Sequence, residues 1–150
     1  MIIDSSIFQR YSLFGGLERE HIDNILPLME RMAYEVGRDI LTEGTLNNKV
    51  CFILEGRVAV VKNGVILAEL KEGDFFGEME VLDIMPTEAT IKALESTTVM
   101  TLSNAALREI YKSDLKIFSL IIMNLARDVS RRLRRMNNIA AKESPPMDWN

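Results

Sequence analysis

The pattern of apolar and polar residues along the chain changes twice. In the first part, apolar residues recur at helical spacing as far as Pro27, which predicts helices within residues 5–28. From about Glu30, short β-rich runs alternate with glycines, which predicts antiparallel strands over residues 30–102. Helical spacing returns after Ser103, a favourable N-cap, so helices are predicted over residues 103–142.

The clearest strand signal is Asn63-Gly64, which lies between two runs of strand-forming residues. Asn-Gly favours the type I′ turn, whose twist matches that of a β-hairpin, so we expect a hairpin at this position. Further strands are expected over residues 50–54, 89–93 and 97–102. The predicted fold class is therefore α+β: an antiparallel, jelly-roll-like β-roll with N-terminal helices and a long C-terminal dimerisation helix.

The C-terminal helix, about 40 Å long at 1.5 Å per residue, is the longest predicted element. Its apolar stripe alternates at spacings of three and four, as in a coiled coil, and it extends beyond the width of a small β-roll. A second copy of the helix is the simplest surface to cover it, and the alternative is that the stripe packs only within the chain. The predicted dimer interface consists of Leu115, Phe118, Ile122, Leu125, Val129 and Met136. Arg132 lies on this stripe as a charged residue and is a defect for a dry interface. Residues 143–150 are expected to form a flexible tail.

Composition and length favour one globular domain over residues 1–142. They also indicate that the chain is not an enzyme. The chain has 150 residues, of which 47% are hydrophobic. Cys51 lies in an apolar run and is expected to be a buried, inert thiol, whereas His21 lies among charged residues and is expected to be solvated. One histidine and one cysteine do not make a metal site, and no nucleophile with a base partner is visible.

Localisation and charge add two further expectations. The start of the chain lacks the features of a secretory signal, and the apolar stretch 117–126 is too short to span a bilayer, so we expect a cytoplasmic location without membrane association. Residues 108–142 carry nine Lys/Arg against three Asp/Glu, a net charge of +6. This charge indicates either a surface for nucleic acid or an acidic partner, or a basic helix that packs on an acidic body.

Three sequence motifs occur in order in the middle of the chain: Glu43-Gly44, the run Phe52 to Val58, and the run Gly73 to Met79. With Leu13 to Leu17 before them and Pro86 to Ile91 after them, the set resembles the cyclic-nucleotide-binding domain of catabolite-activator-type regulators and kinase regulatory subunits. The resemblance covers about residues 12–140. It implies a regulatory sensor domain with a cyclic nucleotide as its ligand.

The resemblance also implies that residues 76–90 form the phosphate-binding cassette, a short helix and loop between two strands. In that family a glutamate, here Glu78, accepts a hydrogen bond from the ribose 2′-hydroxyl, and an arginine after the proline binds the cyclic phosphate. The binding residues implied for this chain are Phe76, Gly77, Glu78, Met79, Thr87, Glu88, Ala89 and Thr90. No other cofactor is implied.

The chain departs from the family at the arginine, where it has Thr87 followed by Glu88. Residues 74–88 contain five acids and no Lys or Arg, so tight binding of cyclic AMP is not expected. Candidates for a substitute cation are Lys92, Arg127 and Arg131.

Two interpretations of function therefore stay open. One is a ligand sensor, and the other is a ligand-independent dimeric interaction module in which the loop keeps its shape because the fold requires it. The family's DNA-reading members add a helix-turn-helix domain after the long helix, so this chain is not expected to bind DNA sequence-specifically.

Overall fold

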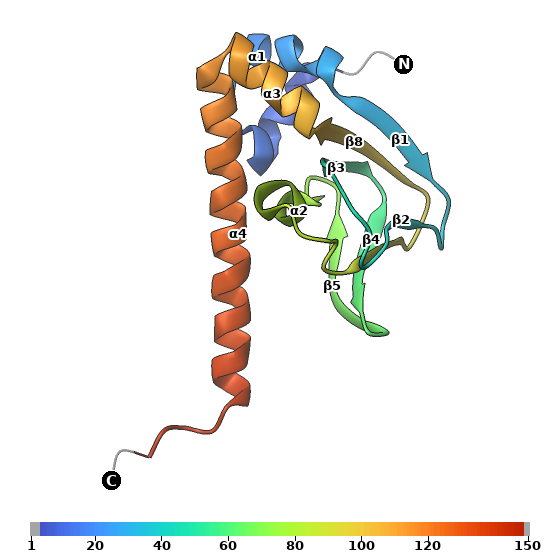
Figure 1. Ribbon diagram of the computed structural model, residues 1–150, viewed down its shortest axis with the longest axis vertical. Helices are drawn as coiled ribbons and strands as arrows, with labels where there is room; N and C mark the ends of the chain where they lie inside the picture. The colour runs from blue at the N-terminus through green and yellow to red at the C-terminus, as the bar shows by residue number, and fades with distance from the viewer. Residues whose placement is uncertain (1–3, 149–150) are drawn as a thin grey trace.

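The computed structural model describes residues 4–148 and consists of a β-roll beside a long helix (Figure 1). The roll has two four-stranded antiparallel sheets, with strand orders β1-β8-β3-β6 and β2-β7-β4-β5. The strands of the first sheet are β1 (Glu30–Tyr34), β8 (Thr97–Ser103), β3 (Lys49–Glu55) and β6 (Phe75–Phe76). Those of the second are β2 (Asp39–Leu41), β7 (Thr90–Ala93), β4 (Arg57–Lys62) and β5 (Val65–Lys71). The predicted α+β fold, an antiparallel β-roll with a long C-terminal helix, is confirmed.

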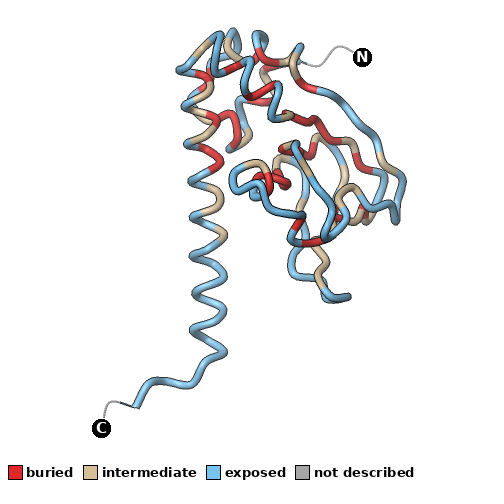
Figure 2. The backbone as a smooth tube through the Cα atoms, viewed as in Figure 1, coloured by how far each residue is buried: buried red, intermediate tan, exposed pale blue. Residues whose placement is uncertain are grey.

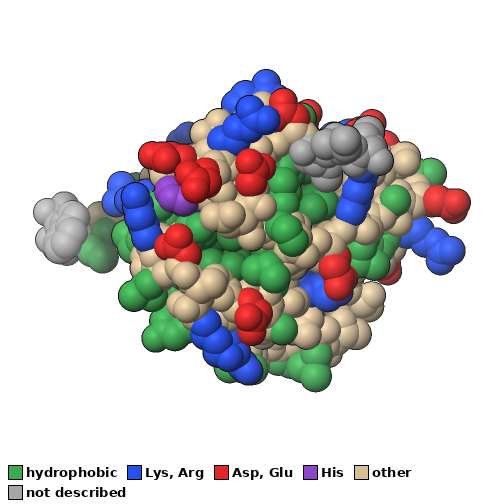
Figure 3. All heavy atoms as spheres, turned by 90° about the horizontal axis from the view of Figure 1, so that it is seen from above, with side chains coloured by type: hydrophobic (Ala, Val, Ile, Leu, Met, Phe, Trp, Pro, Cys, Tyr) green, Lys and Arg blue, Asp and Glu red, His purple; other side chains and the backbone are tan. Residues whose placement is uncertain are grey.

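The N-terminal segment differs from the expected run of regular helices. It consists of three 3₁₀ turns and one short α-helix: η1 (Ser5–Arg10), η2 (Ser12–Phe14), α1 (Arg19–Ile25) and η3 (Leu26–Leu28). The chain turns between η2 and α1 at Gly16, which has a φ of 80°. His21 is not simply solvated, because its Nδ1 accepts the backbone N–H of Glu18 and so caps α1. Figure 3 shows it among acidic side chains at this end of the molecule.

The hairpin predicted at Asn63-Gly64 joins β4 to β5. Both turn residues have positive φ, 52° for Asn63 and 75° for Gly64, as a type I′ turn requires. Strand β5 is at the edge of its sheet, and Val65, Ile66 and Leu67 are exposed on it.

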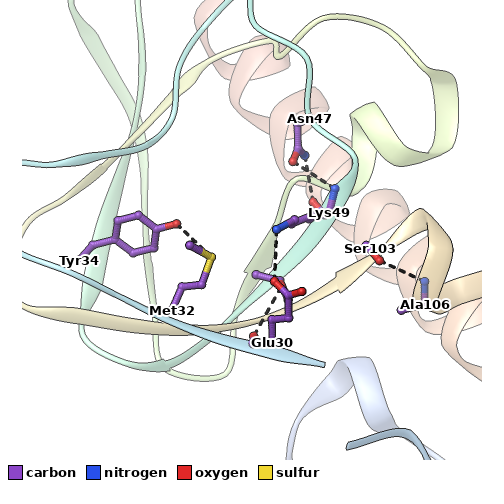
Figure 4. Close-up of polar contacts among 8 residues, drawn as sticks. Glu30, Met32, Tyr34, Asn47, Lys49, Ser103 and Ala106 are labelled. Atoms are coloured by element: carbon purple, nitrogen blue, oxygen red, sulfur yellow. Dashed lines mark hydrogen bonds and ion pairs between the residues drawn. The ribbon is translucent and has the colours of Figure 1, made fainter. Parts of the chain in front are cut away.

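Two helices follow the roll: α3 (Asn104–Ser113) and α4 (Leu115–Glu143). The hydroxyl of Ser103 accepts the N–H of Ala106, and the carboxylate of Asp114 accepts the N–H of Ile117, so each helix begins at a side-chain cap (Figure 4 shows the first). The first half of α4 packs on the body, whereas its second half extends into solvent (Figure 2). Among residues 4–148, no helix is long and apolar enough to cross a membrane.

The core forms two clusters. The larger lies between the first sheet and the helices, and it includes Phe8, Phe14, Phe52, Ile121 and Leu125. The smaller lies inside the roll and includes Cys51, Ile53 and Val58. Cys51 is 3% exposed, and burial raises the pKa of its thiol to about 12. The predicted burial of Cys51 is confirmed.

Candidate functional site

The cassette begins at Gly77, between β6 and the short helix α2 (Glu78–Asp83). Gly77 has a φ of 83°, and a Cβ at this position would lie 2.5 Å from the carbonyl oxygen of Lys49. The side-chain amide of Asn47 donates to the carbonyl oxygens of both Gly77 (3.1 Å) and Lys49 (2.9 Å), the second of which is drawn in Figure 4. Only glycine fits this close, left-handed turn, which places the first turn of α2 beside β3.

Thr87 lies where the family's arginine is expected, and its side chain points into the protein. It is 3% exposed, and both its hydroxyl (2.7 Å) and its backbone N–H (2.8 Å) donate to the carbonyl oxygen of Thr45. The carbonyl oxygen of Thr87 in turn accepts the N–H of Gly44 at 2.9 Å. Thr87 therefore anchors the cassette loop to residues 44–45 and supplies no positive charge.

Glu88 points away from the body and pairs with a lysine of the hairpin. Its Oε1 lies 2.5 Å from Nζ of Lys62, and its side chain is 62% exposed. Its backbone N–H donates to Oε1 of Glu80 at 3.2 Å. The negative charge that the sequence places beside Thr87 is thus partly balanced by Lys62, which lies 26 residues earlier in the sequence.

Glu78 is nearly inaccessible to solvent and is paired with Arg132 of α4. Its Oε1 accepts a hydrogen bond of 2.5 Å from Arg132, which also donates to the carbonyl oxygen of Phe75 and lies over the Phe75 ring. Nε of Arg132 forms a further ion pair of 2.7 Å with Oδ2 of Asp128, although the two groups are not aligned as a hydrogen bond. Burial raises the pKa of Glu78 above its ordinary value of 4.5, and the nearby guanidinium of Arg132 opposes that rise.

Arg132 is therefore the cation beside Glu78 at the start of the cassette, as Lys62 is beside Glu88 at its end, and neither was among the three candidates named from the sequence. Lys92 forms an ion pair with Asp39 at 2.7 Å, Arg127 donates to Asn124 of its own helix, and Arg131 is exposed. Arg132 was interpreted as a defect in a dimer stripe, which is wrong, because it faces its own domain. The sequence feature that could have indicated this orientation is Asp128, an acid one helical turn before Arg132 with which it pairs.

The structure brings together most of the predicted binding residues but exposes two of them. Phe76, Gly77, Glu78, Thr87 and Ala89 are all buried. The hydroxyl of Thr90 accepts the N–H of Glu43, so the Glu43-Gly44 motif and the cassette are neighbours in the fold. Met79 is 49% exposed and, like Glu88, faces solvent. Within residues 4–148, no group of three or more His, Cys, Asp or Glu side chains is placed to hold a metal ion.

Comparisons with known proteins agree on one family. Residues 31–114 match the family model for the cyclic nucleotide-binding domain. The cyclic AMP receptor protein of Thermus thermophilus is 32% identical over 127 residues, which are 81% of this chain and 57% of that protein. A cAMP-dependent protein kinase regulatory subunit of Debaryomyces hansenii is 35% identical over 94 residues, which are 62% of this chain and 21% of the subunit.

Solved structures support the same assignment. A cyclic nucleotide-binding domain from Methylobacillus flagellatus superposes with a TM-score of 0.84 at 26% identity, over 97% of this chain and 85% of that chain. The Thermus thermophilus catabolite activator protein superposes with a TM-score of 0.76 at 29% identity, over 87% of this chain and 62% of that chain. The chain thus spans about half to two thirds of the bacterial regulator and about a fifth of the kinase subunit.

Proposed function

Because this chain belongs to the cyclic nucleotide-binding domain family, we propose that it is a regulatory sensor domain whose cassette does not bind cyclic AMP tightly. The observation that carries the proposal is the position of Thr87, which is buried and hydrogen-bonded to Thr45 where the family places an arginine. A threonine that is engaged in this way offers a phosphate neither charge nor a free donor. We propose no catalytic role for the site.

Electrostatics support weak binding of an anion. Two unit charges 4 Å apart interact by about 4 kcal/mol at an effective dielectric constant of 20, so the loss of an arginine removes an attraction of that order. An affinity lower by about a thousandfold is consistent with such a loss. The two cations that contact the cassette are already paired, Arg132 with Glu78 and Asp128, and Lys62 with Glu88.

A ligand panel tests this proposal on the wild-type protein. Thermal melting is measured with cyclic mononucleotides and cyclic dinucleotides, and cyclic AMP is also titrated by calorimetry. A sensor predicts that at least one compound raises the melting temperature, since a ligand at a hundred times its Kd stabilises a protein by about 2.7 kcal/mol. Submicromolar binding of cyclic AMP would contradict the proposed weak affinity.

We further propose that the chain forms a homodimer through α4. The stripe of α4 that flanks its body-facing side contains the exposed Leu115, Leu133 and Met136, the half-buried Val129, and Ile122, which packs partly against the core of its own chain. Ser119, Ala126 and Ala140 lie on the same stripe at heptad spacing, and such small residues allow a second helix to approach closely. Leu125, which was predicted to lie in the interface, is fully buried in the core of its own chain and is not available to a partner.

A ligand-independent dimeric interaction module is the second candidate function. The pairing of Glu78 with Arg132 favours it, because the carboxylate that would accept a ribose hydroxyl already has a partner inside the chain. The two candidates differ in the ligand panel: a module of this kind forms the dimer, and no compound changes its melting temperature.

A further inference from the structure

Glu80 is a buried acid that the sequence did not single out as a binding residue. It lies in the first turn of α2 and is 7% exposed. Its Oε1 accepts the backbone N–H of Glu88 at 3.2 Å, and its carbonyl oxygen accepts the N–H of Ile84 at 3.1 Å. Glu80 therefore ties the first turn of α2 to the loop that follows this helix.

The hydrogen bond from the Glu88 N–H to Glu80 lies in the part of the chain where a ligand phosphate would be expected. Glu88 directly follows Thr87, and its N–H belongs to the cassette loop on which the family binds phosphate. A backbone N–H that donates to a carboxylate would also suit a phosphate oxygen, because both acceptors are anionic oxygens. In this protein the anionic oxygen that accepts the N–H belongs to Glu80 of the same chain.

The surroundings of Glu80 leave room for a ligand phosphate to compete with its carboxylate for the Glu88 N–H. Glu80 borders a hollow of about 360 Å³, whose other lining residues are Leu46, Asn47, Asn48, Ile84, Met85 and Asn104. Glu80 lines this hollow, whereas Thr87 and Glu88 are not among its lining residues. Two like charges at one donor repel each other, so the internal carboxylate and an external phosphate exclude one another.

We propose that Glu80 is a specificity-determining residue that keeps this cassette closed to phosphate-bearing ligands, because its carboxylate occupies the loop amide as an internal anion. This inference rests on the proposed function, in that it explains why cyclic AMP binds weakly. It adds that restoring the missing arginine is not sufficient, since the negative charge of Glu80 stays at the loop amide and repels a phosphate.

Amide hydrogen exchange tests the contact itself, without any ligand. The Glu88 N–H is expected to be protected in the wild type and to exchange about tenfold faster in Glu80→Ala, because the variant lacks the acceptor. Glu80→Gln keeps an acceptor oxygen and should retain the protection. Glu109→Ala, which removes an exposed acid of α3, is the control and should not affect this amide. Unchanged exchange in Glu80→Ala would overturn the inference.

Calorimetry with cyclic AMP tests specificity in folded variants. Thr87→Arg with Glu80→Ala should bind at least about tenfold more tightly than Thr87→Arg alone. If the alanine variant does not fold, Thr87→Arg with Glu80→Gln replaces it, since it removes the charge and keeps the hydrogen bond, and it too should bind more tightly than Thr87→Arg alone. Equal affinity, including no binding by either protein, would overturn the inference. The proposed function is judged separately, on the wild-type protein, so the two can fail independently.

Discussion

Arg132 of α4 donates a 2.5 Å hydrogen bond to Glu78 of α2, which precedes it by 54 residues in the chain. Every residue of α4 after Arg132 is exposed, so the contact lies where the helix leaves the body. The cassette and the long helix are therefore joined by a charged pair. A change at Glu78 would alter the support of the exposed half of α4.

Replacing Arg132 should destabilise the folded domain. Arg132→Ala leaves the buried carboxylate of Glu78 without its partner, and we expect a loss of about 2 kcal/mol in the free energy of unfolding. Urea denaturation measures it. Arg131→Ala, at an exposed neighbouring position, is the matched control and should change stability by less than about 0.5 kcal/mol. Similar losses in the two variants would show that the pair contributes nothing.

The raised pKa of Glu78 predicts a pH dependence of stability. Because the folded state holds this proton more tightly than the unfolded state, the contribution of Glu78 is full below its ordinary pKa of 4.5 and is lost as pH rises through the raised value. Glu78→Gln cannot titrate, so its stability relative to the wild type should increase from pH 4 to pH 7. Denaturation curves across this range measure the difference in unfolding free energy between the variant and the wild type. A difference that stays constant with pH would contradict the prediction.

The backbone at Gly77 offers a test of the close approach that starts the cassette. Gly77 and Gly37 both have a φ near 84°, but a Cβ on Gly37 meets nothing within 4 Å, whereas one on Gly77 meets the carbonyl oxygen of Lys49 at 2.5 Å. Gly37→Ala should cost about 1 kcal/mol from backbone strain alone. Gly77→Ala should cost roughly 1–3 kcal/mol more from the clash, as thermal melting would measure.

The orientation of α4 predicts which leucine controls assembly. Leu133→Asp should yield a folded monomer, because Leu133 is exposed on the stripe that is proposed to meet a second copy. Leu125→Asp should instead unfold the domain, because it places a charge in the core. Asn138→Asp, on the opposite side of the helix, should leave the dimer intact. Sedimentation and circular dichroism distinguish these results, and a monomeric wild type would refute the dimer.

Cys51 should react only when the protein unfolds. Its thiol is buried, and with a pKa of about 12 it is almost entirely protonated near neutral pH. A thiol-reactive dye at pH 8 should therefore label the native protein very slowly and the urea-denatured protein rapidly. Rapid labelling of native protein would mean that this part of the roll opens readily.

Local structure was largely predictable from neighbouring residues. The hairpin at Asn63-Gly64 follows from the positive φ that this pair tolerates, and the starts of α3 and α4 follow from the caps Ser103 and Asp114. The short 3₁₀ turns before α1 were not predicted as such. Apolar residues at helical spacing suit an α-helix and a series of 3₁₀ turns equally, and packing of Phe8 and Phe14 into the core decides between them.

The sequence by itself determined the family, the antiparallel roll and the absence of an arginine at Thr87, since each depends on residue types in a fixed order. Only the tertiary structure decided that Leu125 and Arg132 face the body and that Glu78 and Glu80 have partners within the chain. The physical reason is that spacings of three and four residues define stripes on a helix but not its rotation. The rotation is set when the whole helix packs, and it determines which distant charges meet.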